Sequence, residues 1–319
     1  MDFERIYRDF TELARIGESA DGSVTRLLFD KSFWEVARKT KAYMEGAGLT
    51  VWTDACGNVH GTWSCGVPEA KTVYMGSHLD TVKEGGLYDG MLGVVGAVEA
   101  FRAFLADPAE KRVNVHILAT NGEEGNDLGG TFGSRAMAGL VDPDVPGYME
   151  KAAAYGLKRE DFDSVQLPMK DGLCYLELHI EQGSVLENTG CTIGIVEGIA
   201  GLERHTIRIE GNSAHAGATP MEGRQDPVTA MSRWILEVTR LAKEREHCVA
   251  TVGSIQVSPG ACNIICGSAE FSLDLRSLRD QDRKEIMEEM AAFEEQLIRQ
   301  EHVRITRWMD QEIPSAPWD

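Results

Sequence analysis

A long apolar helix between two apolar strands constrains the fold of this chain more than any other feature. Residues 90–107, "GMLGVVGAVEAFRAFLAD", are apolar around most of the helix and carry small side chains where it would press on a sheet. Apolar runs at 72–76 and 112–120 precede and follow it and predict short buried strands. Strands that alternate with helices indicate a layered α/β domain with a mostly parallel sheet.

The rest of the first domain is consistent with this layering. Residues 2–16 and 31–46 predict two helices, the second ended by glycines, and two β-rich stretches follow. Residues 141–170 contain several prolines and read as loop, and residues 173–183, "LCYLELHIEQG", predict a further strand. We place the end of this domain at residue 198.

The pattern changes from about residue 199 onward. Strands and helices now follow in the order β-α-β-β-α-β, which is the arrangement of ferredoxin-like modules. The helices are expected at 226–243 and 280–299, and the strands are "ERHTIRIEG", "ATVGSIQVS", "SAEFSLDLR" and "HVRITRWM". Residues 199–312 therefore predict a second, smaller domain.

Composition excludes several classes of function. The net charge of −19 argues against binding to nucleic acid or to an anionic membrane surface. No segment approaches the roughly 20 apolar residues of a membrane span, and the first ten residues lack the apolar core of a signal peptide. Seven cysteines without CxxC spacing indicate reduced thiols and predict a cytoplasmic protein.

A histidine and an aspartate follow the first apolar strand in "YMGSHLDTV". Because residues two apart on a strand point to the same side, His78 and Asp80 would emerge together at its carboxyl end. Such a pair suits a metal ligand and the carboxylate that orients it. The structural alternative is a capped strand end with a surface histidine.

Further polar residues fall at similar positions. Asp89 precedes the buried helix, Glu123 and Glu124 follow the strand at 112–120, and His179 lies near the end of a third strand. Ligands in open α/β sheets gather at the carboxyl ends of strands, and imidazole and carboxylate groups suit zinc or manganese. With Asp89 bridging, the set could hold two ions about 3.5–4 Å apart, leaving a glutamate as general base. The alternatives are unrelated loop carboxylates, with Asp89 as a helix cap.

Several stretches together resemble a known family. They are "GSHLDTV", "YDGMLGVVGAVEA", "NGEEG", "LHIEQG", "NSAHAGATPMEGRQDP", "ACNIICG" and "DLRS". In this order they resemble the M20-type metal-dependent amidases of the hydantoinase/carbamoylase group. That group contains N-carbamoyl-L-amino-acid hydrolases, β-ureidopropionases and allantoate amidohydrolases. The resemblance begins near residue 15 and continues to the last residue. It implies that 1–198 is a metal-binding catalytic domain and 199–312 a dimerisation or lid domain.

The resemblance implies a role for each metal-site residue. His78 would bind one ion, with Asp80 behind it, and Asp89 would bridge the two ions. His179 would be a second ligand of the first ion, and Glu124 would bind the second ion. The cofactor implied is two divalent cations per subunit, zinc or manganese, with cobalt or nickel as alternatives.

It also implies the groups that act on the substrate. Glu123 would be the general base, and Gln182 would lie in the substrate pocket. His215 would stabilise the oxyanion, across the interface of a homodimer formed through 199–312. Asn263 and Arg276 would hold the substrate carboxylate, for which a planar guanidinium is suited. The structural alternatives are a surface ion pair for Arg276 and a tight loop around His215.

The sequence departs from the family at its end. Chains of this family normally return to the first domain and supply a Gly-rich loop and one more ligating histidine, whereas this sequence stops at "EIPSAPWD". We therefore expect only the start of that return, over 313–319, and a weakened second metal site. The sequence has five other histidines, none of which lies in a motif like the missing one: His60, His116, His205, His247 and His302.

Three explanations of the short chain stay open. The gene is truncated or frameshifted, a separate chain supplies the rest, or the protein is a degenerate subunit that keeps the dimer module and has lost catalysis. The leading hypothesis is a binuclear-metal amidohydrolase acting on a linear C–N bond of an N-carbamoyl (ureido) acid. The alternatives are a non-catalytic binding or assembly subunit, and a dipeptidase or aminoacylase with the same metal site.

Overall fold

The chain forms two compact units in the computed structural model. They comprise Met1–Thr189 and Gly190–Asp319. The structure describes residues 2–318, so Met1 and Asp319, the outer ends of the predicted domains, lie outside the described residues. The division after residue 189 precedes the predicted boundary at 198, because the segment after α7 (Val185–Thr189) is grouped with the second unit.

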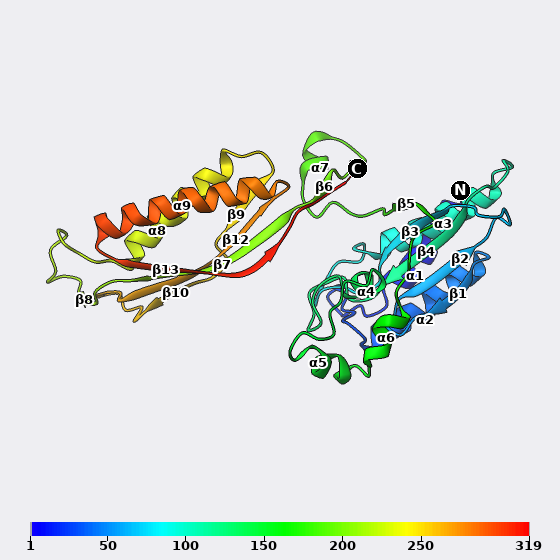
Figure 1. The fold of residues 1–319 in the computed structure, drawn as a ribbon, viewed down its shortest axis with the longest axis horizontal. Helices are drawn as coiled ribbons and strands as arrows, with labels where there is room; N and C mark the ends of the chain where they lie inside the picture. Colours follow the sequence, from blue (N-terminus) through cyan, green and yellow to red (C-terminus); the bar gives the residue numbers. More distant parts are fainter. Residues whose placement is uncertain (1, 319) are drawn as a thin grey trace. The chain divides into compact units, whose positions relative to one another are not determined.

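The first unit is built on a mixed five-stranded sheet. Its strands are β1 (Thr50–Thr53), β2 (Val59–Trp63), β3 (Thr72–His78), β4 (Asn114–Thr120) and β5 (Gly172–Leu176). Their order in the sheet is β1-β2-β4-β3-β5 (Figure 1). β3 runs parallel to both β4 and β5, whereas β1, β2 and β4 pair antiparallel. The predicted layered α/β fold is confirmed, and the parallel strands are the ones that deliver site residues.

Three helices form the main core of the first unit with this sheet. They are α1 (Phe3–Ala14), α2 (Lys31–Gly46) and α3 (Met91–Ala106). α3 contacts β3 and β4 and buries Val94, Val98 and Phe101 completely. Asp2 and Asp30 cap α1 and α2 by accepting main-chain N–H groups of the first turn. Because α3 packs on β3, this apolar helix supports the strand whose last residue is His78.

Two predicted elements of this unit differ from the structure. The stretch 141–170 contains two short helices, α5 (Tyr148–Ala154) and α6 (Arg159–Ser164), which together with α4 (Phe132–Met137) cover an apolar cluster around Phe132 and Phe162. Helices of six or seven residues are too short to give a periodic signal. The strand predicted over 173–183 ends at Leu176, so His179 lies in irregular chain.

The second unit has the predicted ferredoxin-like order. Its main elements are β7 (Gly201–Glu210), α8 (Pro227–Lys243), β9 (Cys248–Thr251), β10 (Ile255–Ser258), β12 (Ser268–Ser277), α9 (Asp280–Glu301) and β13 (Arg304–Ile313). The antiparallel sheet has the order β10-β12-β7-β13, and β9 also pairs with β12. The single strand predicted from "ATVGSIQVS" is therefore two strands. Both helices lie on one face, over a core centred on Trp234 (Figure 1).

Two-residue strands complete the second unit. β8 (Ala214–His215) pairs with β11 (Ile264–Ile265), and β6 (Gly198–Ile199) pairs with β14 (Ala316–Pro317). Part of the segment predicted to begin a return to the first domain therefore pairs within the second unit. Among the described residues, no helix is both long and apolar enough to cross a membrane.

Candidate metal centre

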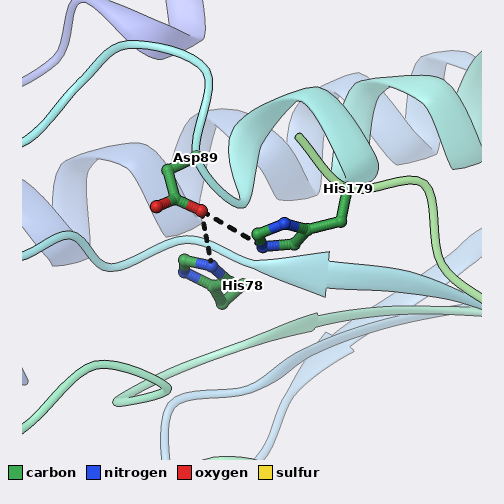
Figure 2. Close-up of side chains that lie close together, drawn as sticks. All are labelled: His78, Asp89 and His179. Carbon is green, nitrogen blue, oxygen red and sulfur yellow. Dashed lines mark ion pairs between the residues drawn. The ribbon is translucent and has the colours of Figure 1, made fainter. Parts of the chain in front are cut away.

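Three side chains from separate segments converge at the carboxyl end of the parallel strands. His78 is the last residue of β3, Asp89 lies in the loop before α3, and His179 follows β5. Asp89 Oδ1 lies 3.5 Å from Nε2 of His78 and 3.1 Å from Nε2 of His179 (Figure 2). His78 is buried, whereas His179 is partly accessible. The predicted convergence of these three residues is thus present in the structure.

Main-chain carbonyls orient both imidazoles. The Nδ1 atom of His78 lies 2.9 Å from the carbonyl oxygen of Asp80, and Nδ1 of His179 lies 2.9 Å from that of Ile180. If each Nδ1–H donates to its carbonyl, both Nε2 atoms are left facing Asp89. Histidine ligands of metals usually donate their other ring N–H in this way.

The carboxylate of Asp89 has one satisfied oxygen and one orphaned oxygen. Oδ2 accepts a hydrogen bond from Nε2 of Gln182 at 2.9 Å. Oδ1 is buried and has no hydrogen-bond partner, although two imidazole nitrogens lie close to it. Two nitrogens and an unpartnered carboxylate oxygen around one point form a donor set that zinc and manganese accept. The residues therefore fit a divalent cation.

A glycine allows Asp89 to approach His78. Gly90 has φ of +65°, and a Cβ there would lie 2.6 Å from Nδ1 of His78. Gly90 is itself the N-cap of α3, and no side chain caps this helix. The alternative in which Asp89 caps the helix is therefore wrong, and its carboxylate stays free for the site. The sequence analysis missed Gly90, because a glycine before a helix is common.

A second potential ligand group contains both glutamates. His78, Glu123 and Glu124 each offer one ligand atom within 4.8 Å of the others, and this group shares His78 with the first. Burial raises the pKa of both carboxyls, and the charge of Glu123 raises that of Glu124 further. Crowded carboxylates of this kind gain stability from a cation.

Asp80 acts differently from the prediction. β3 ends at His78, so Asp80 is no longer on the strand, and its carboxylate oxygen is 3.8 Å from Nδ1 of His78. It is the main-chain carbonyl of Asp80 that orients His78. The carboxylate instead accepts the main-chain N–H groups of Glu123 and Glu124, both at 3.0 Å. Asp80 thereby joins the two turns that carry the ligand groups.

Charges within the site shift the pKa of two residues strongly. Burial lowers the pKa of His78, but the carboxylates of Asp89 and Asp80 outweigh burial and raise it to about 9. The neighbouring His78 holds the pKa of Asp89 at about 2, although burial opposes this. The site therefore favours a positive charge next to its carboxylates, and a divalent cation would supply one.

Two buried asparagines anchor the turn with the glutamates, and the sequence analysis missed them. The side-chain oxygen of Asn58 accepts the main-chain N–H of Asn121 at 3.0 Å. The side-chain amide of Asn121 donates to the carbonyl of Cys56 at 3.0 Å. Both side chains are fully buried. No motif marks them, because asparagine in a loop is usually interpreted as a turn residue.

The second unit carries the remaining predicted residues. His215 lies on β8, opposite Ile264 of β11, so Asn263 is its close neighbour. Nδ1 of His215 accepts the main-chain N–H groups of Gly217 and Ala218, both at 3.2 Å. The proton of a neutral His215 therefore resides on Nε2, which can donate.

Arg276 lies elsewhere in the second unit. It is eight residues along β12 from Ser268, about 26 Å at the rise of a strand, and Ser268 is the end nearer to Asn263. Its guanidinium forms an ion pair with Asp274, with Nε 2.6 Å from Oδ1. The predicted contact of both Asn263 and Arg276 with one carboxylate stays a prediction, and within one chain most of the length of β12 lies between the two residues.

Comparison with known proteins identifies the family. Residues 74–304 match the model of peptidase family M20/M25/M40. The chain belongs to this family. The match includes both potential ligand groups as well as most of the second unit, and it confirms the predicted M20 relationship.

Individual relatives narrow the resemblance. The chain is 37% identical to an N-carbamoyl-L-amino acid amidohydrolase of Geobacillus stearothermophilus, over 97% of this chain and 78% of the relative. It is 32% identical to allantoate deiminase 2 of Glycine max, over 91% of this chain and 67% of the relative. A hydantoinase/carbamoylase family amidase from Burkholderia ambifaria superimposes with a TM-score of 0.88 at 29% identity, over 100% of this chain and 80% of that one. The predicted hydantoinase/carbamoylase resemblance is confirmed.

Proposed function

We propose that this M20 family member hydrolyses a linear C–N bond of an N-carbamoyl (ureido) acid, such as an N-carbamoyl-L-amino acid or allantoate. The observation that carries the proposal is the convergence of His78 and His179 on the unpartnered Oδ1 of Asp89. The relatives named as carbamoyl amino acid and allantoate enzymes support the substrate class. The products would be an amino acid, carbon dioxide and ammonia, or the corresponding acid for allantoate.

Divalent cations would occupy the two ligand groups. His78, Asp89 and His179 would hold the first cation, and Glu124 would hold the second, with Asp89 bridging. Bound cations would supply Lewis acidity toward the ureido carbonyl oxygen and ease deprotonation of water. Gln182 would keep Asp89 in the orientation that exposes Oδ1, because it donates to Oδ2.

Glu123 would act as the general base. It adjoins Glu124, and its main chain is held by Asp80, so the carboxylate has a fixed position beside the ligand groups. It would take a proton from the attacking water and deliver it to the departing nitrogen. His215 would stabilise the oxyanion through Nε2–H, the tautomer favoured by its two main-chain contacts.

Arg276 and Asn263 are proposed to bind the substrate carboxylate. Arg276 would exchange its ion pair with Asp274 for a two-point contact with the substrate. Because β12 separates Arg276 from Asn263 and His215, we place the latter two in the site of a second copy of the chain. A cytoplasmic homodimer formed through the second unit would meet this requirement.

Metal-loaded protein and a panel of substrates test the proposal. Release of ammonia is measured with N-carbamoyl-L-amino acids, β-ureidopropionate, allantoate and, for comparison, dipeptides, after incubation with Mn²⁺ or Zn²⁺. We expect hydrolysis of at least one ureido acid and little of any dipeptide. Cleavage of dipeptides alone would indicate a peptidase instead. Cation binding without turnover of any compound would indicate a binding or assembly subunit.

A further inference from the structure

A buried arginine lies behind the candidate metal centre. Arg26 is completely buried, although it belongs to the loop between α1 and α2. Its guanidinium donates to three main-chain carbonyls: Nε to Leu79 at 2.7 Å, and Nη1 to Ala14 and Ile16, both at 2.9 Å. Burial of a charged guanidinium is costly unless its surroundings compensate it, so its location requires an explanation.

The hydrogen bond from Arg26 to the carbonyl of Leu79 fixes main chain that belongs to the candidate metal centre. Leu79 is the residue between His78 and Asp80. Its carbonyl accepts from Arg26, and its N–H donates to the carbonyl of Thr120 at the end of β4. The main chain that connects His78 to Asp80 is therefore fixed from both sides.

Two main-chain hydrogen bonds of Arg26 also fix Thr81, the residue after Asp80. The main-chain N–H of Arg26 donates to Oγ1 of Thr81, and its carbonyl accepts the N–H of Thr81, both at 2.9 Å. Arg26 thus binds residues 79 and 81, which flank Asp80. The side chain of Asp80 in turn positions Glu123 and Glu124.

The carboxylates of Asp80 and Asp30 compensate the charge of Arg26 only in part, at longer range than an ion pair. Burial lowers the pKa of Arg26 to about 10, and the charges of Asp80 and Asp30 oppose that effect. Nη2 has no hydrogen-bond partner in the structure. The attraction between this cation and the Asp80 carboxylate adds to the hydrogen bonds that fix the turn.

We propose that Arg26 is a positioning residue of the metal centre. It fixes the His78–Asp80 turn through the carbonyl of Leu79 and through its charge, and so keeps the His78 imidazole and the Asp80-bound glutamates at the spacing a cation needs. This inference rests on the metal centre of the proposed function, but it concerns cation affinity and is independent of the substrate.

The test compares the cation affinities of purified full-length variants. Arg26→Met removes the charge and the three hydrogen bonds of the guanidinium while retaining similar volume and the main-chain contacts with Thr81. Arg26→Lys retains the charge but cannot span three carbonyls with a planar group. Affinities for Zn²⁺ and Mn²⁺ are measured by competition with a chromophoric chelator, and the ligand geometry by the visible absorption of bound Co²⁺.

A matched control separates positioning from general stability. Arg283 is equally buried and donates to the carbonyls of Ser277 and Ile313 and to Asp280, all in the second unit. Arg283→Met should lower the unfolding temperature, as Arg26→Met should, but without changing cation affinity or the Co²⁺ spectrum.

We expect Arg26→Met to weaken cation binding about 10- to 100-fold, the usual effect of removing a group that orients metal ligands, and Arg26→Lys to weaken it less. If Arg26→Met does not fold, a weakened affinity and altered Co²⁺ spectrum in Arg26→Lys support the inference. Parental affinity in the folded Arg26 variants, or an equal loss in Arg283→Met, would overturn it. A parent that binds cations but hydrolyses no ureido acid refutes the proposed function alone, and a parent that binds none refutes both.

Discussion

The carboxylate of Asp80 accepts the main-chain N–H of Glu123 at 3.0 Å and thereby ties the turn after β3 to the turn after β4. A second hydrogen bond, to the N–H of Glu124, has the same length. His78 depends on the main-chain carbonyl of Asp80 and not on its side chain. The two potential ligand groups therefore depend on Asp80 in different ways.

Asp80→Asn should impair the glutamate group more than the histidine group. The amide is neutral and has only one accepting oxygen, so one N–H of the glutamate turn loses its acceptor and the other keeps only an uncharged one, at a cost of about 1.5–3 kcal/mol. We expect a high-affinity cation to remain and a second one to be lost. Elemental analysis of dialysed protein measures this, and loss of both cations together would contradict it.

Glu123→Gln should separate catalysis from metal binding. Loss of a general base reduces turnover about 100- to 10,000-fold. The amide keeps the size of the side chain, so metal content should stay near that of the parent. Glu124→Gln is the comparison, because it should reduce metal content as well as turnover. Parental turnover in Glu123→Gln would exclude Glu123 as the base.

Two inactive variants should restore activity when mixed, if His215 acts on the site of a second copy. In a dimer of one His215→Ala chain and one Glu123→Gln chain, one site has Glu123 of its own chain and His215 of the other. After random reassociation of equal amounts, about a quarter of the parental activity should appear, because half the dimers are mixed and each has one intact site. No recovery, with mixed dimers verified by differential tags, would mean that His215 acts within its own chain.

Gly90→Ala should destabilise both the fold and the site. A Cβ would lie 2.6 Å from Nδ1 of His78, and the positive φ costs a further 1–2 kcal/mol or so. Gly86→Ala is a matched control in the same loop, with nothing within 4 Å of its Cβ and no positive φ. Thermal unfolding and Zn²⁺ titration should show a loss for Gly90→Ala only. Equal behaviour of the two variants would show that the close approach to His78 is relieved by relaxation.

Acid should destabilise the first unit through His116. Burial and, to a smaller extent, the neighbouring His60 lower the pKa of this imidazole to about 4, although Asp171 opposes the effect. In the unfolded chain the imidazole of His116 has a pKa near 6.5, so the unfolded state binds the proton more readily than the folded state. The free energy of unfolding should therefore fall as pH falls from about 6.5 to 4. The loss is on the order of 3 kcal/mol, since one pKa unit corresponds to about 1.4 kcal/mol.

Chemical denaturation at several pH values measures this dependence. His116→Gln should flatten it within that pH window, whereas His247→Gln, which changes an exposed histidine, should leave it unchanged. A parental pH dependence in His116→Gln would assign the acid sensitivity to other groups.

Several parts of the fold and site could be predicted from sequence because their signals are local or repeated. The apolar α3 and the runs of β3 and β4 specify the layers, and polar residues that follow such strands specify where a site forms. His78, Asp89 and His179 could be grouped for this reason. The β-α-β-β-α-β order of the second unit could be predicted for the same reason.

Other parts depend on tertiary contacts that leave no local signal. β5 ends at Leu176 although apolar residues continue to alternate beyond it, so alternation alone overextended the strand. Asp80 was expected to orient His78 by its side chain, but β3 ends at His78, two residues before Asp80, so the Asp80 side chain no longer follows the alternation of the strand. Arg26 and Asn58 act through main-chain groups distant in sequence, which no spacing reveals.

His78 belongs to both potential ligand groups, yet its Nδ1 faces the Asp80 carbonyl and only Nε2 has a free lone pair. One lone pair can serve one cation at a time. The cation that takes this lone pair would have nitrogen as well as oxygen ligands, whereas the second would rely on oxygen atoms, so the two cations should differ in affinity. The ambient concentration of metal would then set how many chains carry a complete pair.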